Sequence, residues 1–129
     1  MTAEASYPSD LRYHPEHDWA RVDGEIATLG VTWFAQSELG DIVFCDLPDL
    51  GKSLRQGDAY AELESVKAVS DVIAPVSGEV IEINDVVTDE PSTVNEDPYG
   101  NGWLVRVRLA ELAELQTLLS AEAYQELIR

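Results

Sequence analysis

The chain is constrained most by a series of short apolar runs that are separated by turns containing glycine. Each run has the length of a β-strand rather than of a helix, and the runs cover residues 25–31, 41–47, 59–63, 69–73, 79–83 and 103–109. A glycine, an acidic residue and an apolar or small residue follow one another at Gly24, Gly40, Gly57 and Gly78, at intervals of 16, 17 and 21 residues. This pattern predicts a compact sandwich or barrel of short strands.

Three segments are expected to be helical. Residues 32–39 end before a glycine, residues 91–95 have the length of a single turn, and residues 110–129 form the clearest helical region. In this last region Ser120 is expected to cap a second short helix. Four leucines before it are predicted to form one apolar face that packs on the sheets: Leu112, Leu115, Leu118 and Leu119.

We predict one domain over residues 1–129, with residues 1–10 as a loose N-terminal lead-in. The chain carries 25 acidic and 8 basic residues, which give a formal charge of −17. Nucleic acids and anionic membranes bind proteins through clustered lysine and arginine, so neither is an expected partner. The strong negative charge also favours a monomer, because identical chains repel one another.

No apolar run is long enough to span a membrane. The first ten residues include two acidic residues and no basic one, unlike a signal peptide or a mitochondrial transit peptide. We therefore expect a cytoplasmic protein of the bacterial or archaeal type, without a transit peptide.

Residues that usually carry out catalysis or bind metals are few in this sequence. The two histidines, His14 and His17, flank Pro15, which disfavours a helix that would direct both rings at one metal. The single cysteine, Cys45, lies in an apolar run and is expected to be a small buried hydrophobic side chain. No glycine-rich phosphate loop leads into a helix. We therefore predict neither an enzyme nor a metal site.

The segment 62–71 places a reactive side chain where a modifying enzyme can reach it. Strand-like runs flank this segment, so Lys67 falls at the tip of a predicted hairpin, between acidic residues. The chain has one other lysine, Lys52, in the turn 51–53. From these residues alone, a solvated turn lysine remains the simpler interpretation of Lys67.

A longer set of ordered motifs changes that interpretation. Around the lysine they are Glu64-Ser65-Val66-Lys67-Ala68, Ser70-Asp71 and Ala74-Pro75-Val76-Ser77-Gly78-Glu79-Val80. Earlier ones include His17-Asp18-Trp19 and Leu39-Gly40-Asp41-Ile42-Val43-Phe44, and later ones Asp97-Pro98-Tyr99-Gly100 and Gly102-Trp103-Leu104. From about Leu11 to its end, the chain resembles the glycine cleavage system H-protein family, and the hairpin is similar to that family's lipoyl-lysine hairpin.

The resemblance implies a fold, a cofactor and a set of partners. The implied fold is mainly β, a barrel-sandwich hybrid of two antiparallel sheets with short helices, including a C-terminal helical region. Lipoate would join Lys67 through an amide bond, attached by a lipoyl ligase or transferase. The implied partners are a pyridoxal-phosphate glycine decarboxylase (P protein), a tetrahydrofolate-dependent aminomethyltransferase (T protein) and a dihydrolipoyl dehydrogenase (L protein). The chain would carry the aminomethyl group of glycine between the first two, and its dithiol to the third.

The loaded arm is expected to rest in a cleft that excludes water. Its amine is cationic, so nearby carboxylates would stabilise it, and the candidates are Glu16, Asp18 and Asp71. Residues 16–19 match the part of the family that lines this cleft, with Trp19 as an expected apolar wall. Simple solvation of Glu16 and Asp18 is the competing interpretation.

Other functions remain open at this point. H-like lipoyl carriers also serve in lipoate relay and in sulfur metabolism. A biotinyl carrier is a further alternative, but such domains usually have methionine on both sides of the lysine, where this chain has Val66 and Ala68. An unmodified interaction domain is a third alternative, and an enzyme in its own right is disfavoured by the missing catalytic residues.

Overall fold

The structure is a computed structural model and describes residues 5–129. Its strands are β1 (Arg12–His14), β2 (Asp18–Asp23), β3 (Ile26–Val31), β4 (Ile42–Asp46), β5 (Ser53–Leu54), β6 (Ala59–Ser65), β7 (Val69–Ile73), β8 (Gly78–Ile83) and β9 (Val105–Leu109). Its helices are α1 (Trp33–Leu39), α2 (Asp85–Asp89), α3 (Thr93–Glu96), the 3-10 helix η1 (Leu112–Thr117) and α4 (Ala121–Ile128). All six predicted strand segments are therefore confirmed, and β1, β2 and β5 are additional.

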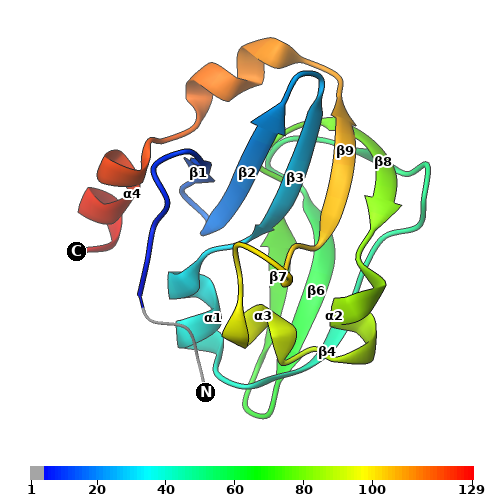
Figure 1. The fold of residues 1–129 in the computed structure, drawn as a ribbon, viewed down its shortest axis with the longest axis vertical. Helices are drawn as coiled ribbons and strands as arrows, with labels where there is room; N and C mark the ends of the chain where they lie inside the picture. The colour runs from blue at the N-terminus through cyan, green and yellow to red at the C-terminus, as the bar shows by residue number, and fades with distance from the viewer. Residues whose placement is uncertain (1–4) are drawn as a thin grey trace.

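The strands form two antiparallel sheets, which confirms the predicted fold class. The larger sheet has six strands in the order β1-β2-β3-β9-β8-β5, and the smaller has three in the order β4-β6-β7. The main hydrophobic core takes residues from both sheets, including Leu29, Val107, Leu63 and Val72. The β6–β7 hairpin extends to one end of the molecule, at the bottom of Figure 1.

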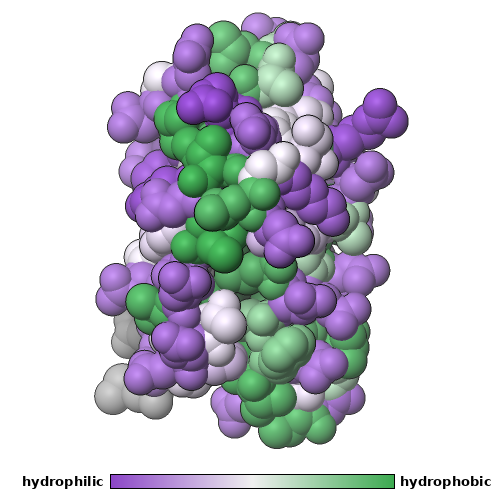
Figure 2. Space-filling model, turned by 90° about the vertical axis from the view of Figure 1, so that its right-hand side faces the viewer, coloured by the Kyte–Doolittle hydropathy of each residue, from purple (hydrophilic) through white to green (hydrophobic). Residues whose placement is uncertain are grey.

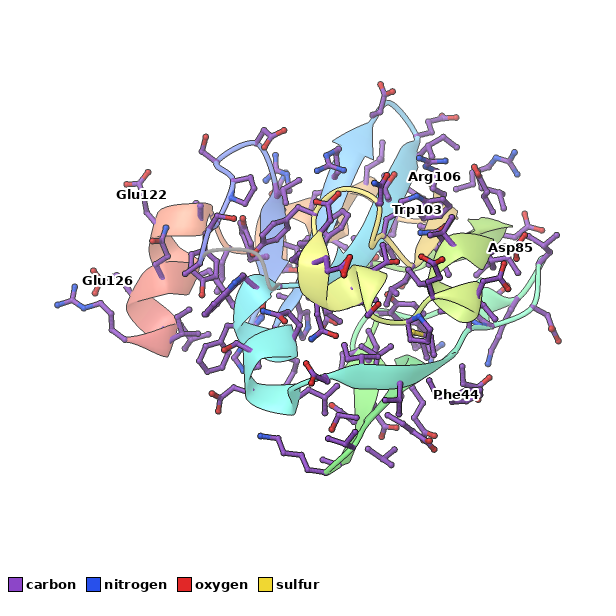
Figure 3. All side chains as sticks on the ribbon, turned by 60° about the horizontal axis from the view of Figure 1, so that its bottom comes forward. Phe44, Asp85, Trp103, Arg106, Glu122 and Glu126 are labelled. Atoms are coloured by element: carbon purple, nitrogen blue, oxygen red, sulfur yellow. The ribbon has the colours of Figure 1, made fainter. Side chains whose placement is uncertain are left out.

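A second hydrophobic cluster attaches α4 to the edge of the larger sheet. It contains Tyr13 and Trp19 from the first two strands and Ala121 and Tyr124 from α4. Tyr13 also pairs with Leu119 through two backbone hydrogen bonds, of 2.7 and 2.8 Å. On the opposite face of α4, Glu122 and Glu126 point away from the body of the molecule (Figure 3). The helix therefore has one apolar side that packs on the sheet and one acidic side.

The N-terminal lead-in predicted for residues 1–10 falls partly outside the described residues, which begin at residue 5. In its described part, the Tyr7 ring packs against Tyr124 with the two ring centroids 5.7 Å apart. The backbone carbonyl of Ser6 accepts a hydrogen bond of 2.7 Å from the hydroxyl of Tyr99. These residues thus contact the second cluster, although they form no helix or strand.

The helices differ in part from expectation. The capping roles of Thr32 and Ser120 are confirmed, since their hydroxyls accept hydrogen bonds from the amides of Ala35 and Ala123. Helix α2 was not expected; the side chain of Asn84 caps it. The short turn predicted at residues 91–95 is present as α3, shifted by two residues at its start.

The single leucine face predicted for the C-terminal region is wrong. Residues 112–117 form a 3-10 helix, and Leu112 is 55% exposed. Leu115 and Leu118 pack against the main core, whereas Leu119 packs against the second cluster. The carboxylate of Glu114 accepts two hydrogen bonds of 2.7 Å from the amide and the hydroxyl of Ser77. These hydrogen bonds hold residues 112–117 close to the sheet.

Cross-strand contacts also order the outer face of the larger sheet. Arg106 of β9 forms an ion pair of 2.8 Å with Glu82 of β8, its partner in the strand register. The guanidinium carbon of Arg106 also lies 4.2 Å from the centre of the Trp103 ring, and the two side chains lie side by side in Figure 3. Such pairs support the sheet modestly, each contributing about 0.2–1 kcal/mol.

Candidate functional site

Lys67 lies at the tip of the β6–β7 hairpin, as the sequence predicts. The hydroxyl of Ser65 accepts hydrogen bonds from the amides of Lys67 and Ala68, at 3.2 and 3.1 Å. The backbone amide of Ser65 donates to the carbonyl of Ala68, at 2.8 Å, and closes the turn. Lys67 is exposed, and its neighbour Val66 is 76% exposed. The turn is therefore held by its own hydrogen bonds, while the lysine stays accessible.

The stem of Lys67 lies against the end of α1. A Cβ added to Gly40 would lie 3.4 Å from Cε of Lys67 and 3.9 Å from its Nζ. Gly40 ends α1 with φ of +85°, a backbone conformation that other residues adopt at a cost. Glycine at this position thus lets the helix end tightly and lets the lysine stem pass close to the backbone.

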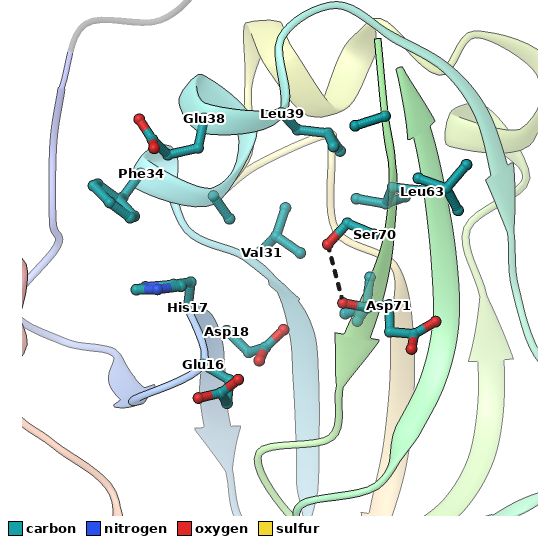
Figure 4. A pocket seen from close by; sticks show the side chains of 14 residues that line it. Glu16, His17, Asp18, Val31, Phe34, Glu38, Leu39, Leu63, Ser70 and Asp71 are labelled. Carbon is teal, nitrogen blue, oxygen red and sulfur yellow. Dashed lines mark hydrogen bonds between the residues drawn. The ribbon is translucent and has the colours of Figure 1, made fainter. Parts of the chain in front are cut away.

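A pocket of about 370 Å³ opens beside the hairpin (Figure 4). One wall, which we call the inner wall, consists of residues 16–18 and Val31. The second, the hairpin wall, consists of residues 68–72. Helix α1 closes the pocket with Phe34 and Glu38. The pocket combines apolar side chains with carboxylates, so it suits a ligand that has an apolar chain and a cationic end.

The structure brings the three predicted acidic residues to this one pocket. Glu16 and Asp18 line the inner wall, and Asp71 lies opposite on the hairpin wall, beside Ser70 (Figure 4). Glu16 and Asp71 are exposed, whereas Asp18 is only 1% exposed. Solvation, the competing interpretation from the sequence, therefore does not apply to Asp18.

Asp18 is the most unusual of these carboxyls. Its Oδ2 atom and the hydroxyl of Tyr60 are the buried side-chain oxygens that have no hydrogen-bond partner among residues 5–129. Burial raises the pKa of the Asp18 carboxyl well above its ordinary value; nearby Glu16 raises this pKa further, and a backbone hydrogen bond from Ile73 lowers it. A buried acceptor without a partner is costly, so this atom is poised to accept a donor from a ligand.

Trp19 does not line the pocket, contrary to expectation. It is fully buried behind the inner wall, where its indole nitrogen donates to the carbonyls of Val31 and Pro98. A Cβ on Gly30 would lie 2.6 Å from the indole ring, so the ring packs directly on this backbone. Trp19 therefore supports the inner wall from within the second cluster, and Val31, Leu39 and Leu63 provide the apolar lining.

The sequence placed His17 within the cleft-lining segment 16–19 but gave it no role of its own, and it did not identify Phe34 as a pocket residue. His17 has φ of +76°, the only positive value outside glycine among the described residues. Its ring lies 4.8 Å from that of Phe34, and its Nδ1 lies 2.8 Å from the hydroxyl of Tyr124. The motif that contains His17 was visible in the sequence, but its contact with a tyrosine 107 residues away was not.

Residues 5–129 contain neither a metal-binding cluster nor a membrane-spanning helix. No group of three or more histidines, cysteines or carboxylates is arranged to hold a metal ion. No helix in this part of the chain has the length and apolar character needed to cross a bilayer.

Comparison with known proteins gives consistent results. The family described as Glycine cleavage H-protein matches residues 11–129. A glycine cleavage system H protein of Carboxydothermus hydrogenoformans is 52% identical over 121 residues, which cover 94% of this chain and 93% of that protein. One of Symbiobacterium thermophilum is 48% identical over 120 residues, covering 93% and 94%.

A solved structure is similar over nearly the whole fold. The crystal structure of a glycine cleavage system H protein from Mycobacterium marinum matches with a TM-score of 0.85 and 38% identity, covering 92% of this chain and 96% of that one. The chain studied here belongs to the glycine cleavage H-protein family.

Proposed function

We propose that this chain is a carrier in glycine cleavage whose lipoyl arm is attached to Lys67. It takes the aminomethyl group of glycine from the decarboxylase to the aminomethyltransferase, and then presents its dithiol to dihydrolipoyl dehydrogenase. Membership in the family supports the lipoyl-carrier role in glycine cleavage. The choice of lysine and the order of the partners are the parts of the proposal that need experiment.

The position of Lys67 is the observation that carries this proposal. Its amine is exposed at a hairpin tip, and the next residue, Ala68, already belongs to the pocket wall. Lys52 lies in a turn that borders a different hollow, lined by Asp46, Asp49 and Glu62 among others. An arm on Lys67 therefore has both a route to partner enzymes and a resting site nearby.

The residues of the pocket fit a loaded arm. When bound, the lipoyl dithiolane supplies the redox and group-transfer chemistry, because its disulfide can open to accept the aminomethyl cargo. The chain contributes binding and protection. Asp18, with its unpaired Oδ2, binds the cationic end together with Glu16 and Asp71, and the apolar lining excludes water.

The chain itself is proposed to have no catalytic activity. Its single thiol, Cys45, is buried, and burial raises the pKa of that thiol to about 11. A thiol with so high a pKa is a poor nucleophile at neutral pH. All chemistry on the cargo is therefore assigned to the partner enzymes, and the carrier brings a high local concentration of arm to each active site.

The surface around the hairpin suits docking of large partners. Val43 and Phe44 of β4 and Val66 and Val69 of the hairpin are about half exposed or more. Figure 2 shows hydrophobic residues grouped at the lower end of the molecule, the end to which the hairpin extends in Figure 1, with hydrophilic residues around them. An apolar centre with a polar surround is a usual composition for a protein interface. We propose that the lipoyl ligase or transferase and the three enzymes approach at this end.

The experiment compares two lysine variants of the full chain. Wild type, Lys67→Arg and Lys52→Arg are produced in a host that makes lipoate, and their intact masses are measured. Wild type and Lys52→Arg should carry one lipoyl group, and Lys67→Arg should carry none. Attachment removes one positive charge, so the formal charge of −17 becomes −18 and ion exchange separates the two forms.

Function is then measured by reconstitution. Glycine-dependent CO₂ exchange should require both the decarboxylase and the lipoylated carrier, and should be absent with Lys67→Arg. A biotinyl mass would support the biotinyl alternative. Normal lipoylation without any glycine-dependent exchange would favour a carrier in lipoate relay or sulfur metabolism. Lipoate on Lys52, or sustained turnover by the carrier alone, would contradict the proposal.

A further inference from the structure

Tyr124 of α4 makes hydrogen bonds to both the inner wall and α1, although it lies outside the pocket. Its hydroxyl is 2.8 Å from Nδ1 of His17, which lines the inner wall. The same hydroxyl is 2.8 Å from the hydroxyl of Thr32, the residue that caps α1. Tyr124 and Thr32 are fully buried, so these bonds are shielded from water.

The hydrogen bonds form a continuous series from α4 to the first turn of α1. Burial lowers the pKa of His17, while the carboxylates of Glu16 and Glu38 raise it in part, and a neutral imidazole can accept at Nδ1. When the imidazole carries its proton on Nε2, Tyr124 donates to His17 Nδ1 and accepts from the hydroxyl of Thr32. The hydroxyl oxygen of Thr32 in turn accepts from the amide of Ala35, at 3.2 Å. In this arrangement the Ala35 amide, the Thr32 hydroxyl and the Tyr124 hydroxyl each donate to one acceptor.

The role of this series is distinct from that of the backbone. The amide of Thr32 already donates to the carbonyl of His17, at 3.1 Å, which joins the two main chains. That bond leaves the imidazole free to rotate. The hydroxyl of Tyr124 fixes the ring, which also packs against the Phe34 ring of α1, 4.8 Å away, and edge-on against the Tyr124 ring, 5.8 Å away. His17 also holds a left-handed backbone conformation, which places its neighbours Glu16 and Asp18 at the pocket.

We propose that Tyr124 is a positioning residue for the arm pocket, holding the His17 ring and the start of α1 so that the pocket excludes water around the loaded arm. This inference rests on the proposed function. The tyrosine ring is itself fixed by stacking on Tyr13, with centroids 5.0 Å apart and planes at 14°. The C-terminal helix thereby sets the geometry of a pocket that none of its own residues lines.

The test uses Tyr124→Phe in the full lipoylated chain, because this change removes the hydroxyl and keeps the ring stack. The lifetime of the methylamine-loaded carrier is measured without aminomethyltransferase. It should fall about fivefold or more, since the hydroxyl makes two hydrogen bonds and the loss of one neutral bond alone corresponds to about fivefold. Lipoylation and loading by the decarboxylase should be unchanged. The ¹⁵N chemical shift of His17 Nδ1 should also change, because this nitrogen loses its donor.

Tyr13→Phe is the matched control. The hydroxyl of Tyr13 belongs to the same aromatic stack, but it donates to the carbonyl of Pro8, at 2.7 Å, away from the pocket. This variant should keep the wild-type lifetime. An equal loss in both variants would show that only general packing matters, and would overturn the inference.

Two variants of His17 provide an independent test. Asparagine tolerates a positive φ and offers a polar group near the position of Nδ1, so His17→Asn should retain most of the lifetime. His17→Gly also tolerates the backbone conformation but has no side chain, and should shorten the lifetime. Equal lifetimes for His17→Gly, Tyr124→Phe and wild type would refute this inference and would leave the proposed function unaffected. If the wild-type chain accepts no lipoate, the proposed function fails together with this inference.

Discussion

The two walls of the pocket differ in how they are held: Asp18 and Val31 of the inner wall are buried, whereas residues 68–71 of the hairpin wall are exposed and held mainly by local bonds. Asp18 and Trp19 are buried at the start of β2, and the Trp19 indole donates hydrogen bonds to the carbonyls of Val31 and Pro98 in two other segments. Val69, Ser70 and Asp71 of β7 are all exposed, and the side chain of Ser70 bonds only to the adjacent carbonyl of Asp71 among the described contacts. The pocket therefore has one fixed side and one accessible side.

This difference suits the two tasks that a carrier arm must perform. On the proposed function, partner enzymes need to reach Lys67, and the hairpin that bears this lysine projects and stays solvated. Protection needs a surface that keeps its shape and excludes water, so the opposite wall is built into the core. The same division predicts that substitutions on the two walls will have effects of different kinds.

The largest expected difference is in stability. Trp19→Ala, behind the inner wall, should lower the free energy of unfolding by about 3–5 kcal/mol, because a buried ring is replaced by a cavity. Val69→Ala, on the hairpin wall, should change it by less than about 0.5 kcal/mol. Urea titration of the unlipoylated chain measures both. Comparable losses would show that the two walls are equally part of the core.

The next effect concerns the lifetime of the methylamine-loaded arm. Asp18→Asn should shorten it about tenfold, as expected for a buried charged hydrogen bond, and Asp71→Asn only two- to threefold, because exposed pairs are screened. Lipoylation should be unaffected in both variants. Unchanged lifetimes in both would leave the cleft without an acidic role. A larger effect of Asp71 would reverse the comparison between the walls.

A smaller effect is expected on the pH dependence of stability. Burial raises the pKa of Asp18, so the folded chain binds this proton more tightly than the unfolded chain does. The Asp18 carboxyl therefore makes its full contribution to the free energy of unfolding below about pH 4, the ordinary pKa of aspartate. This contribution is lost as the pH rises toward the raised pKa. Asp18→Asn should gain stability relative to wild type across that window.

Urea titrations at several pH values check this expectation. A difference between Asp18→Asn and wild type that stays constant across this range would mean that folding does not desolvate the Asp18 carboxyl.

The smallest expected effect is on association with the decarboxylase. A surface with a formal charge of −17 should meet partners partly through long-range attraction, so the association rate should fall about threefold between low and physiological salt. Glu64→Gln and Asp71→Asn, at the hairpin, should reduce this salt dependence, whereas buried Asp18→Asn should not. Stopped-flow measurements at several salt concentrations provide the rates, and a flat profile would exclude steering.

Local patterns were sufficient to predict the hairpin wall. The runs on either side of Lys67 have strand length, and the turn between them is closed by residues four positions apart or fewer. Helix α2 could not be predicted in the same way, because Val86, Val87 and Thr88 are β-branched and individually weak helix formers. Its cap at Asn84 and the burial of Val87 outweigh that preference.

The inner wall could be predicted only through the family resemblance. The motif at residues 17–19 indicated where the cleft lies, but an aspartate is ordinarily exposed, so nothing local suggests that Asp18 is buried. Its burial results from the packing of both sheets around it. The link from His17 to Tyr124 likewise depends on the docking of α4, which joins residues more than a hundred positions apart.

The burial of Cys45 has a practical consequence for following the arm. The thiol lies on the core side of β4 and its pKa is raised, so the native chain offers thiol-specific reagents almost no thiolate of its own. On a carrier whose arm ends in a dithiol, rapid alkylation therefore reports the arm alone. Mass spectrometry after brief labelling can then count reduced, loaded and oxidised arms without removing any residue of the protein.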